Sequence, residues 1–160
     1  MIKIWEADEW KKYYDLEKIR SGVRLCFDAG IDPEVRRACK EFCVWMRKKY
    51  FFPVRVPIYV KNRKKIKALD GDWVFGTFFM PDDRNLEPYI RIAVGDYSEL
   101  VLKLGKDNAL ATILGTISHE LTHYFQWINH AELTQIGIER QASRISSLII
   151  DEYAETREHP

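Results

Sequence analysis

Residues 107–129 constrain the fold most, because this stretch has the apolar periodicity of one long α-helix. Apolar side chains recur along it every three or four residues, as on the buried side of a helix: Leu110, Leu114, Ile117, Leu121, Tyr124 or Phe125, and Ile128. The opposite side carries polar side chains: Thr112, Thr116, His119, His123 and Gln126. The sequence therefore predicts a helix that packs on a core and turns two histidines toward a cleft.

The two histidines belong to the segment His119-Glu120-Leu121-Thr122-His123, an HExxH motif. Residues i and i+4 lie on one helix face, about 6 Å apart along the axis. Two neutral imidazoles at that spacing can bind one Zn²⁺ ion. Glu120 projects about 100° further round the helix, where it can reach a water in an open metal position. The motif predicts His119 and His123 as zinc ligands and Glu120 as general base.

A catalytic zinc site needs a third protein ligand. Gln126 and Asn129 occupy the positions where metzincin sites have a glycine and a third histidine, which excludes that class. His130 lies about 10 Å further along the helix than His123, so it reaches the same metal only if the helix breaks early. The remaining candidates are carboxylates near the C-terminus: Glu132, Glu139, Glu152 and Glu155.

A helical hairpin favours Glu139 among these carboxylates. If the first helix ends near residue 129 and an antiparallel helix follows, residues equally far from the turn lie side by side. His123 and Glu139 are each eight residues from position 131, inside the expected turn. Glu139 also borders the apolar stripe of the second helix, where a buried carboxylate is costly without a cation. Glu139 is therefore the first choice and Glu152 the second.

The N-terminal third is predicted to be mainly helical. Residues 5–20 have a loose three-to-four spacing of apolar side chains, and residues 23–27 alternate as a short strand does. Asp32 as N-cap and Pro33 at the first helical position predict a helix that continues to about Tyr50.

The middle of the chain is predicted to form a small sheet. Residues 54–61 alternate, residues 73–80 are rich in aromatics, and residues 89–94 form a further strand. Pro57 favours an edge position for the first of these strands. Helices, a small sheet and helices again, without regular βαβ alternation, predict an α+β fold with a mostly antiparallel sheet.

Composition limits the class of protein. A chain of 160 residues fits one domain. Its content of 46% apolar and 31% charged residues excludes a disordered chain. The net charge of +1 disfavours nucleic acid as a partner, and the one basic cluster, residues 61–67, is expected to be a solvated loop. No apolar run reaches the roughly 18 residues of a membrane span. Three cysteines without framework spacing indicate free thiols and a cytoplasmic location.

An HExxH motif followed by a glutamate on the next helix resembles the gluzincin arrangement. The run Glu139-Arg140-Gln141-Ala142-Ser143 resembles the Glu-x-x-Ala pattern of small intracellular gluzincins, the ImmA/IrrE-like and minigluzincin peptidases. The segment 119–126 is similar to their active-site helix. The similarity covers roughly residues 54–155, which implies a minimal zincin core with residues 1–50 as an N-terminal helical addition, all in one domain, 1–160.

The resemblance implies a zinc metallopeptidase that hydrolyses peptide or protein substrates, with Zn²⁺ held by His119, His123 and Glu139 and with Glu120 as general base. Many gluzincins orient a ligand histidine with an aspartate near the third ligand. Ser143 occupies the corresponding position, and its hydroxyl can accept the same N–H bond. Tyr153 and Tyr124 are the candidates for stabilising the oxyanion of the transition state.

Residues 89–94 resemble the edge strand along which such peptidases bind substrate antiparallel. The alternative to a peptidase is a latent or non-peptidase regulatory protein that binds zinc, with the tail 156–160 or the N-terminal helices covering the cleft. A third hypothesis is a peptidase that associates with nucleic acid through residues 61–67. The sequence leaves the substrate and the oligomeric state open.

Overall fold

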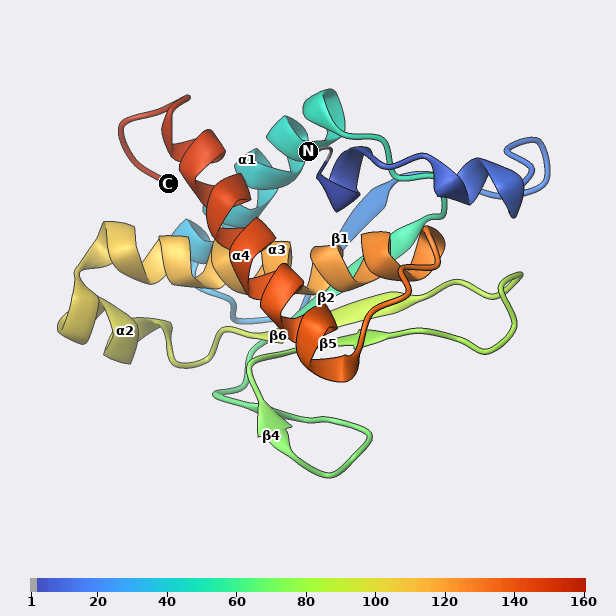
Figure 1. The fold of residues 1–160 in the computed structure, drawn as a ribbon. Helices are drawn as coiled ribbons and strands as arrows, with labels where there is room; N and C mark the ends of the chain where they lie inside the picture. The colour runs from blue at the N-terminus through green and yellow to red at the C-terminus, as the bar shows by residue number, and fades with distance from the viewer. Residues whose placement is uncertain (1–2) are drawn as a thin grey trace.

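A computed structural model describes residues 3–160 of the chain. It has an α+β fold with four α-helices, short 3-10 helices and a mixed four-stranded sheet (Figure 1). The elements in chain order are η1 (Ile4–Glu6), η2 (Glu9–Lys12), β1 (Val23–Phe27), α1 (Pro33–Lys49), β2 (Val56–Lys61), β3 (Ile66–Lys67), β4 (Trp73–Val74), β5 (Gly76–Phe79), β6 (Tyr89–Ala93), α2 (Tyr97–Leu104), α3 (Lys106–Ile128) and α4 (Gln135–Ala154).

The main sheet has the strand order β1-β2-β6-β5 and is mostly parallel. β1 pairs parallel with β2 and β2 pairs parallel with β6, whereas β5 alone is antiparallel to its neighbour β6. The prediction of a mostly antiparallel sheet is therefore wrong. Helix α1 forms a crossover between β1 and β2, and crossover connections give parallel neighbours. Alternation along the sequence marks a strand but does not give its direction.

The edge positions also differ from the prediction. β2 and β6 are both internal strands, whereas β1 and β5 form the two edges. Pro57 fits inside β2 because the Val56 N–H donates to Gly22 on the β1 side (2.9 Å), so the Pro57 nitrogen faces the β6 side. Pairing with β6 begins only at Ile58, so no hydrogen bond is lost. The strand 89–94 is thus not the edge strand, and β5 lies at the edge beside α3.

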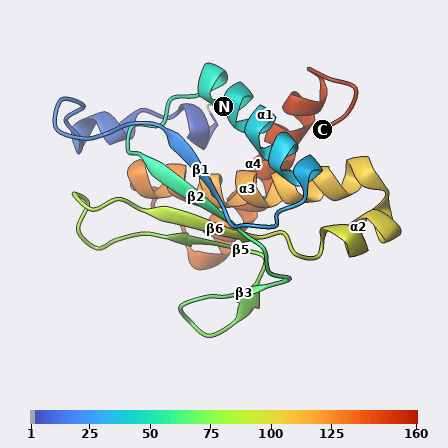
Figure 2. The same ribbon diagram turned by 180° about the vertical axis from the view of Figure 1, so that it is seen from behind.

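One face of the sheet is covered by helices and carries the core. α1 and α3 pack on this face and α4 packs against α3, while no helix of residues 3–160 covers the opposite face (Figures 1 and 2). The core side chains include Val56, Ile58, Val60, Ile90 and Ile92 from the strands and Phe42, Leu114, Ile117 and Leu121 from the helices. The stripe predicted for residues 107–129 is buried in this core.

Residues 5–20 do not form the single helix that their spacing predicts. They contain η1 and η2, joined by Ala7 and Asp8, because tertiary contacts hold the aromatic side chains. Buried Trp5 donates from Nε1 to Thr122 Oγ1 on α3 (2.9 Å), and the Trp10 N–H donates to Asn129 Oδ1 (3.0 Å). With β1 in the sheet and α1 on the core, the described part of residues 1–50 shares one core with the rest.

The helix predicted after Asp32 is confirmed. Asp32 accepts a hydrogen bond from the Glu34 N–H (2.8 Å), and α1 ends at Lys49. Its cysteines Cys39 and Cys43 are free and buried in the core, and Cys26 is free on β1. Among the described residues no helix has both the length and the apolarity to cross a membrane.

Candidate metal centre

The histidines and Glu139 meet because α3 and α4 form an antiparallel hairpin. Ser118 Oγ donates to Ser146 O (3.4 Å) and Gln126 Nε2 donates to Ile138 O (3.0 Å), so the contacts run in opposite chain directions. Thr134 ends the turn as N-cap of α4 and accepts from the Gly137 N–H (3.0 Å). The predicted turn and hairpin are confirmed.

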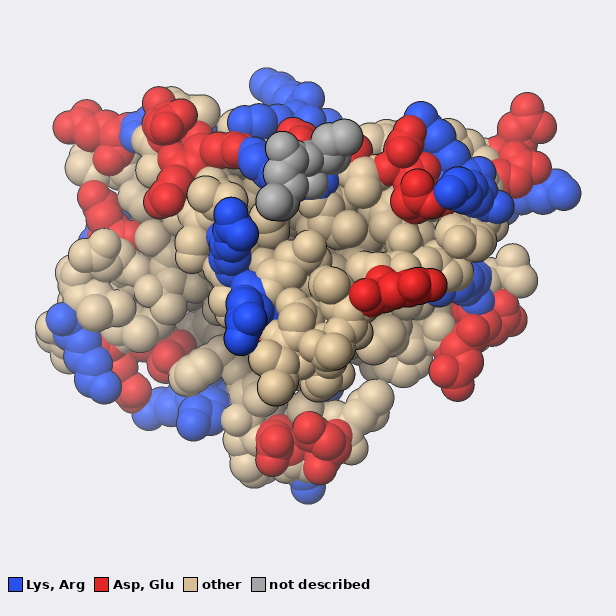
Figure 3. Space-filling model, viewed as in Figure 1, with Lys and Arg blue, Asp and Glu red and all other residues tan. Residues whose placement is uncertain are grey.

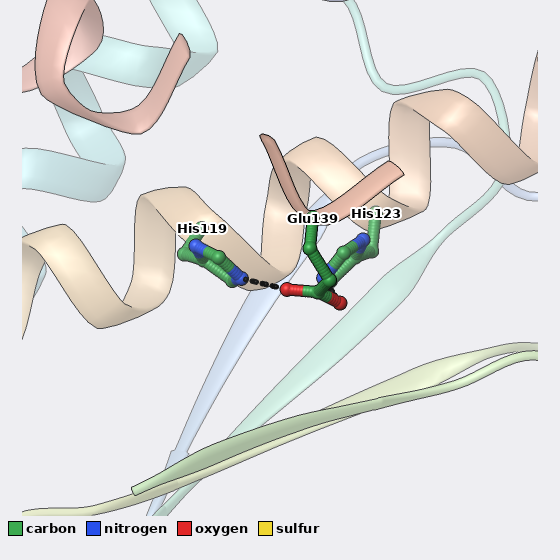
Figure 4. A group of neighbouring side chains, drawn as sticks. All are labelled: His119, His123 and Glu139. Carbon is green, nitrogen blue, oxygen red and sulfur yellow. Dashed lines mark hydrogen bonds and ion pairs between the residues drawn. The ribbon is translucent and has the colours of Figure 1, made fainter. Parts of the chain in front are cut away.

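His119, His123 and Glu139 converge on one point beneath this hairpin (Figure 4). His119 Nε2 lies 3.2 Å from Glu139 Oε2, and His123 Nε2 lies 3.1 Å from Glu139 Oε1. The ligand atoms of the three residues all lie within 4.8 Å of one another. Two imidazole nitrogens and a carboxylate at this spacing can hold a metal ion.

Gln126 fixes the orientation of His123 and was not identified from the sequence as a site residue. Its Nε2 donates to Ile138 O (3.0 Å) and to Gln141 Oε1 (2.9 Å), which leaves its Oε1 as the acceptor for His123 Nδ1 at 2.8 Å. The Nδ1 of His123 therefore carries the proton, and Nε2 keeps its lone pair toward Glu139. The sequence feature that could have identified Gln126 as a site residue is its i,i+3 spacing from His123 on the same helix.

His119 lacks a comparable partner. Burial, and secondly the neighbouring His123, lower the pKa of His119, which favours the neutral imidazole that a metal requires. Ser143 is exposed, and within residues 3–160 its hydroxyl forms no hydrogen bond with either histidine. The orienting role predicted for Ser143 is therefore not seen.

Glu120 lies buried beside the triad and against the edge strand β5. Its side chain is 7% exposed, and burial together with the charge of Glu139 raises its pKa to about 8. A Cβ atom placed on Gly76 of β5 would lie 3.0 Å from Glu120 Oε1 and 2.7 Å from Thr116 Cγ2. A larger residue at position 76 would require the strand or these side chains to shift. A glycine inside a strand is a sequence signal for such a close approach, and it was not used to predict Gly76 as a site residue.

The two predicted oxyanion tyrosines lie elsewhere. The Tyr124 hydroxyl donates to Val54 O (2.6 Å) and accepts from the Val54 N–H (3.0 Å) in the core. Tyr153 is buried against α1, with Phe42 and Trp45 at ring-centroid distances of 4.9 and 5.2 Å. Neither tyrosine lines the cleft at the triad, so the structure does not bring the two predicted oxyanion residues to the site.

The other candidate ligands are also engaged elsewhere. His130 follows the end of α3 with φ 51°, and its Nδ1 faces Arg84 (3.3 Å). Glu152, the second choice, accepts from the Tyr50 hydroxyl (2.8 Å) and pairs with Lys49 (3.0 Å) and Lys3. Among the candidate ligands within residues 3–160, Glu139 alone completes the group with both histidines.

The triad opens onto two hollows that meet at His119 and Glu120. One, of about 750 Å³, extends along β5 between α3, the N-terminal turns of α4 and the β3–β4 hairpin. The other, of about 650 Å³, lies between α3 and α4 and is lined by small and hydroxyl side chains. The tail is bound elsewhere, through His159 Nδ1 to Asp107 (2.7 Å) and Pro160 O to Arg37 (2.9 Å). Neither residues 156–160 nor η1 and η2 line the two hollows.

Both signs of charge occur on the face of the molecule that Figure 3 shows. On the face drawn in Figure 3 the acidic and basic side chains are interspersed, consistent with the net charge of +1. In the basic cluster, Lys61 pairs with Asp28 (3.5 Å) and Lys64 pairs with Glu99. These pairs fit the solvated loop that the sequence predicts.

Comparison with known proteins assigns no family. No protein-family model matches the chain, and searches of curated proteins and of solved structures find no significant match. The site itself therefore defines only a class: an α+β protein with a His-His-Glu group that can hold a metal ion.

Proposed function

We propose that this chain is a zinc-dependent peptidase. The observation that supports the proposal is the convergence of His119, His123 and Glu139 in a cleft that also contains buried Glu120. Two imidazoles and one carboxylate are the ligand set of catalytic zinc sites that keep a position open for water. Glu120 does not belong to the ligand group, so it is free to act on the reacting water.

Glu120 carries the proton transfers in this proposal. A bound zinc ion would polarise the peptide carbonyl and lower the pKa of a water toward 7. Glu120 accepts a proton from the attacking water as the new C–O bond forms, and donates it to the amine as the C–N bond breaks. Its burial favours the protonated carboxyl, which helps Glu120 to hold the proton between the two steps.

The open edge of β5 is the proposed binding strand for the substrate, in place of residues 89–94. Phe75 O accepts from the Ala93 N–H (2.7 Å), so Phe75 and every second residue after it direct their backbone groups toward β6. Gly76 and Phe78 therefore direct theirs to the open edge. A peptide that pairs with them extends the sheet by one strand and passes Glu120 at Gly76.

Removal and return of the metal tests the proposal. Protein dialysed against a chelator is expected to lose hydrolysis of an unfolded reporter protein, and one equivalent of Zn²⁺ is expected to restore it. Zinc content by plasma emission and cleavage by gel and mass spectrometry are measured on the same samples. Equal cleavage without metal would contradict the zinc mechanism. Zinc binding without cleavage under any condition would leave the regulatory zinc-binding protein as the better account.

Substitution of Gly76 by alanine tests the close approach of β5 to Glu120. The added methyl group meets Thr116 at 2.7 Å and Glu120 at 3.0 Å, so the strand or the carboxylate must shift. We expect kcat/KM to fall about 10- to 100-fold with zinc content unchanged, since a shift of about 1 Å at a site can cost that much. Gly115→Ala is the matched control, because its methyl group enters open space beside the same cleft. Equal activity of the two variants would contradict the role of Gly76.

A further inference from the structure

Arg91 is a cation beside the proposed binding strand that the hydrolytic mechanism does not use. It lies on β6 directly across from Thr77 of β5, so the two side chains share one face of the sheet. This is the face that no helix of residues 3–160 covers (Figure 2). Arg91 and Thr77 both line the 750 Å³ hollow, which therefore extends past the edge strand onto this face.

Several N–H donors of the Arg91 guanidinium form no hydrogen bond within residues 3–160. One of its nitrogens donates to Lys67 O (3.0 Å), whereas its Nε is buried without a hydrogen-bond partner. Among residues 3–160 no acidic side chain forms an ion pair with Arg91. Arg55 differs, since its guanidinium is paired with Glu87 at 2.7 and 3.0 Å. A guanidinium that lines a hollow without an ion pair can bind an anionic acceptor there.

The geometry of strand addition brings one substrate side chain to this arginine. On a strand paired with β5, the residue opposite Thr77 directs its side chain to the same face as Thr77 and Arg91. Thr77 is short and Arg91 is long, so the guanidinium can extend past the threonine toward the added strand. Asp70 of the exposed hairpin turn also lines the hollow, and its carboxylate accepts from the Asp72 N–H (2.9 Å).

We propose that Arg91 forms a subsite for an acidic side chain, aspartate or glutamate, of a peptide bound along β5. The inference rests on the proposed function for the position of the peptide, and it adds the class of substrate. The fork of N–H donors in a guanidinium suits a carboxylate, which accepts two hydrogen bonds. Because Gly76 packs on Glu120, the residue beside Thr77 lies close to the bond to be cleaved.

Peptide binding tests the subsite separately from hydrolysis. Labelled ten-residue peptides carry a single glutamate or glutamine at each position in turn, and their binding to zinc-loaded Glu120→Gln protein is measured by fluorescence anisotropy. We expect glutamate to bind about tenfold tighter than glutamine at one position, as for a hydrogen bond to a charged group. Arg91→Gln is expected to remove the preference while binding of the glutamine peptide is unchanged. Arg91→Glu is expected to reverse the preference in favour of lysine.

Arg24→Gln is the matched control, because Arg24 is exposed on β1, at the opposite edge of the sheet. It is expected to keep the full preference for glutamate. Three results would overturn the proposed subsite. They are equal binding of glutamate and glutamine peptides, a preference for glutamate that survives Arg91→Gln, and the absence of binding of any peptide. If the wild-type protein cleaves peptides without a preference for acidic residues, the proposed subsite is wrong but the proposed peptidase function still holds. If peptides bind in an Arg91-dependent way but are not cleaved, the proposed peptidase function is wrong but the proposed subsite still holds.

Discussion

Replacement of Glu120 by glutamine is expected to reduce peptide hydrolysis about 10²- to 10⁴-fold, the usual contribution of a general base. Glutamine has nearly the same shape but cannot accept the proton of the attacking water. Zinc content should stay at that of the wild type, because Glu120 does not belong to the group of ligand atoms that converges in the cleft. The measurements are kcat/KM on a peptide identified with the wild-type protein, and zinc by plasma emission.

The fold is expected to tolerate the Glu120→Gln change. Glu120 is 7% exposed and burial raises its pKa to about 8, so exchange for the nearly isosteric, neutral glutamine removes no stabilising charge interaction. Glu132→Gln serves as control, since Glu132 lies exposed in the turn between α3 and α4. A Glu120→Gln protein that keeps its zinc and cleaves within tenfold of the wild-type rate would show that another group acts as base.

Replacement of Glu139 by glutamine is expected to weaken zinc binding by at least about 100-fold, with loss of hydrolysis at limiting zinc. The change removes the only anionic ligand of the group and leaves two imidazoles, whereas structural and catalytic sites use three or more protein ligands. Competition with a chromogenic chelator measures the affinity. Thermal unfolding gives a second readout, because a ligand present at 100 times its Kd adds about 2.7 kcal/mol to the free energy of unfolding.

The competing carboxylates provide the controls for Glu139. Glu132→Gln should bind zinc as the wild type does, since Glu132 is exposed in the turn. Glu152→Gln should also keep zinc but unfold at lower temperature, because Glu152 joins Lys3, Lys49 and Tyr50. Undiminished zinc affinity in Glu139→Gln, or its loss in Glu132→Gln, would place the third ligand elsewhere.

The metal-binding group was predictable because it depends on local geometry. The i,i+4 spacing puts His119 and His123 on one helix face wherever the helix lies. Glu139 followed from the symmetry of a hairpin about its turn, which needs only the two helix ends. The N-cap at Asp32 is equally local, because a side chain bonds a backbone group two residues away.

Features that depend on distant segments were predicted poorly. The direction of the strands follows from the crossover through α1, which alternation cannot reveal. Gln126 orients His123 only through its contacts with Ile138 and Gln141 on the next helix. Tyr124 lies four residues from Glu120 and looked available for catalysis, yet its hydroxyl binds the backbone of Val54, 70 residues away.

The most direct test of the zinc centre is anomalous diffraction at the zinc absorption edge from crystals of the zinc-loaded protein. One strong peak is expected at about 2.0–2.2 Å from His119 Nε2, His123 Nε2 and a carboxylate oxygen of Glu139, with the Glu120 carboxylate outside bonding distance. A peak ligated by other residues, or no peak at these three in fully loaded protein, would contradict the account.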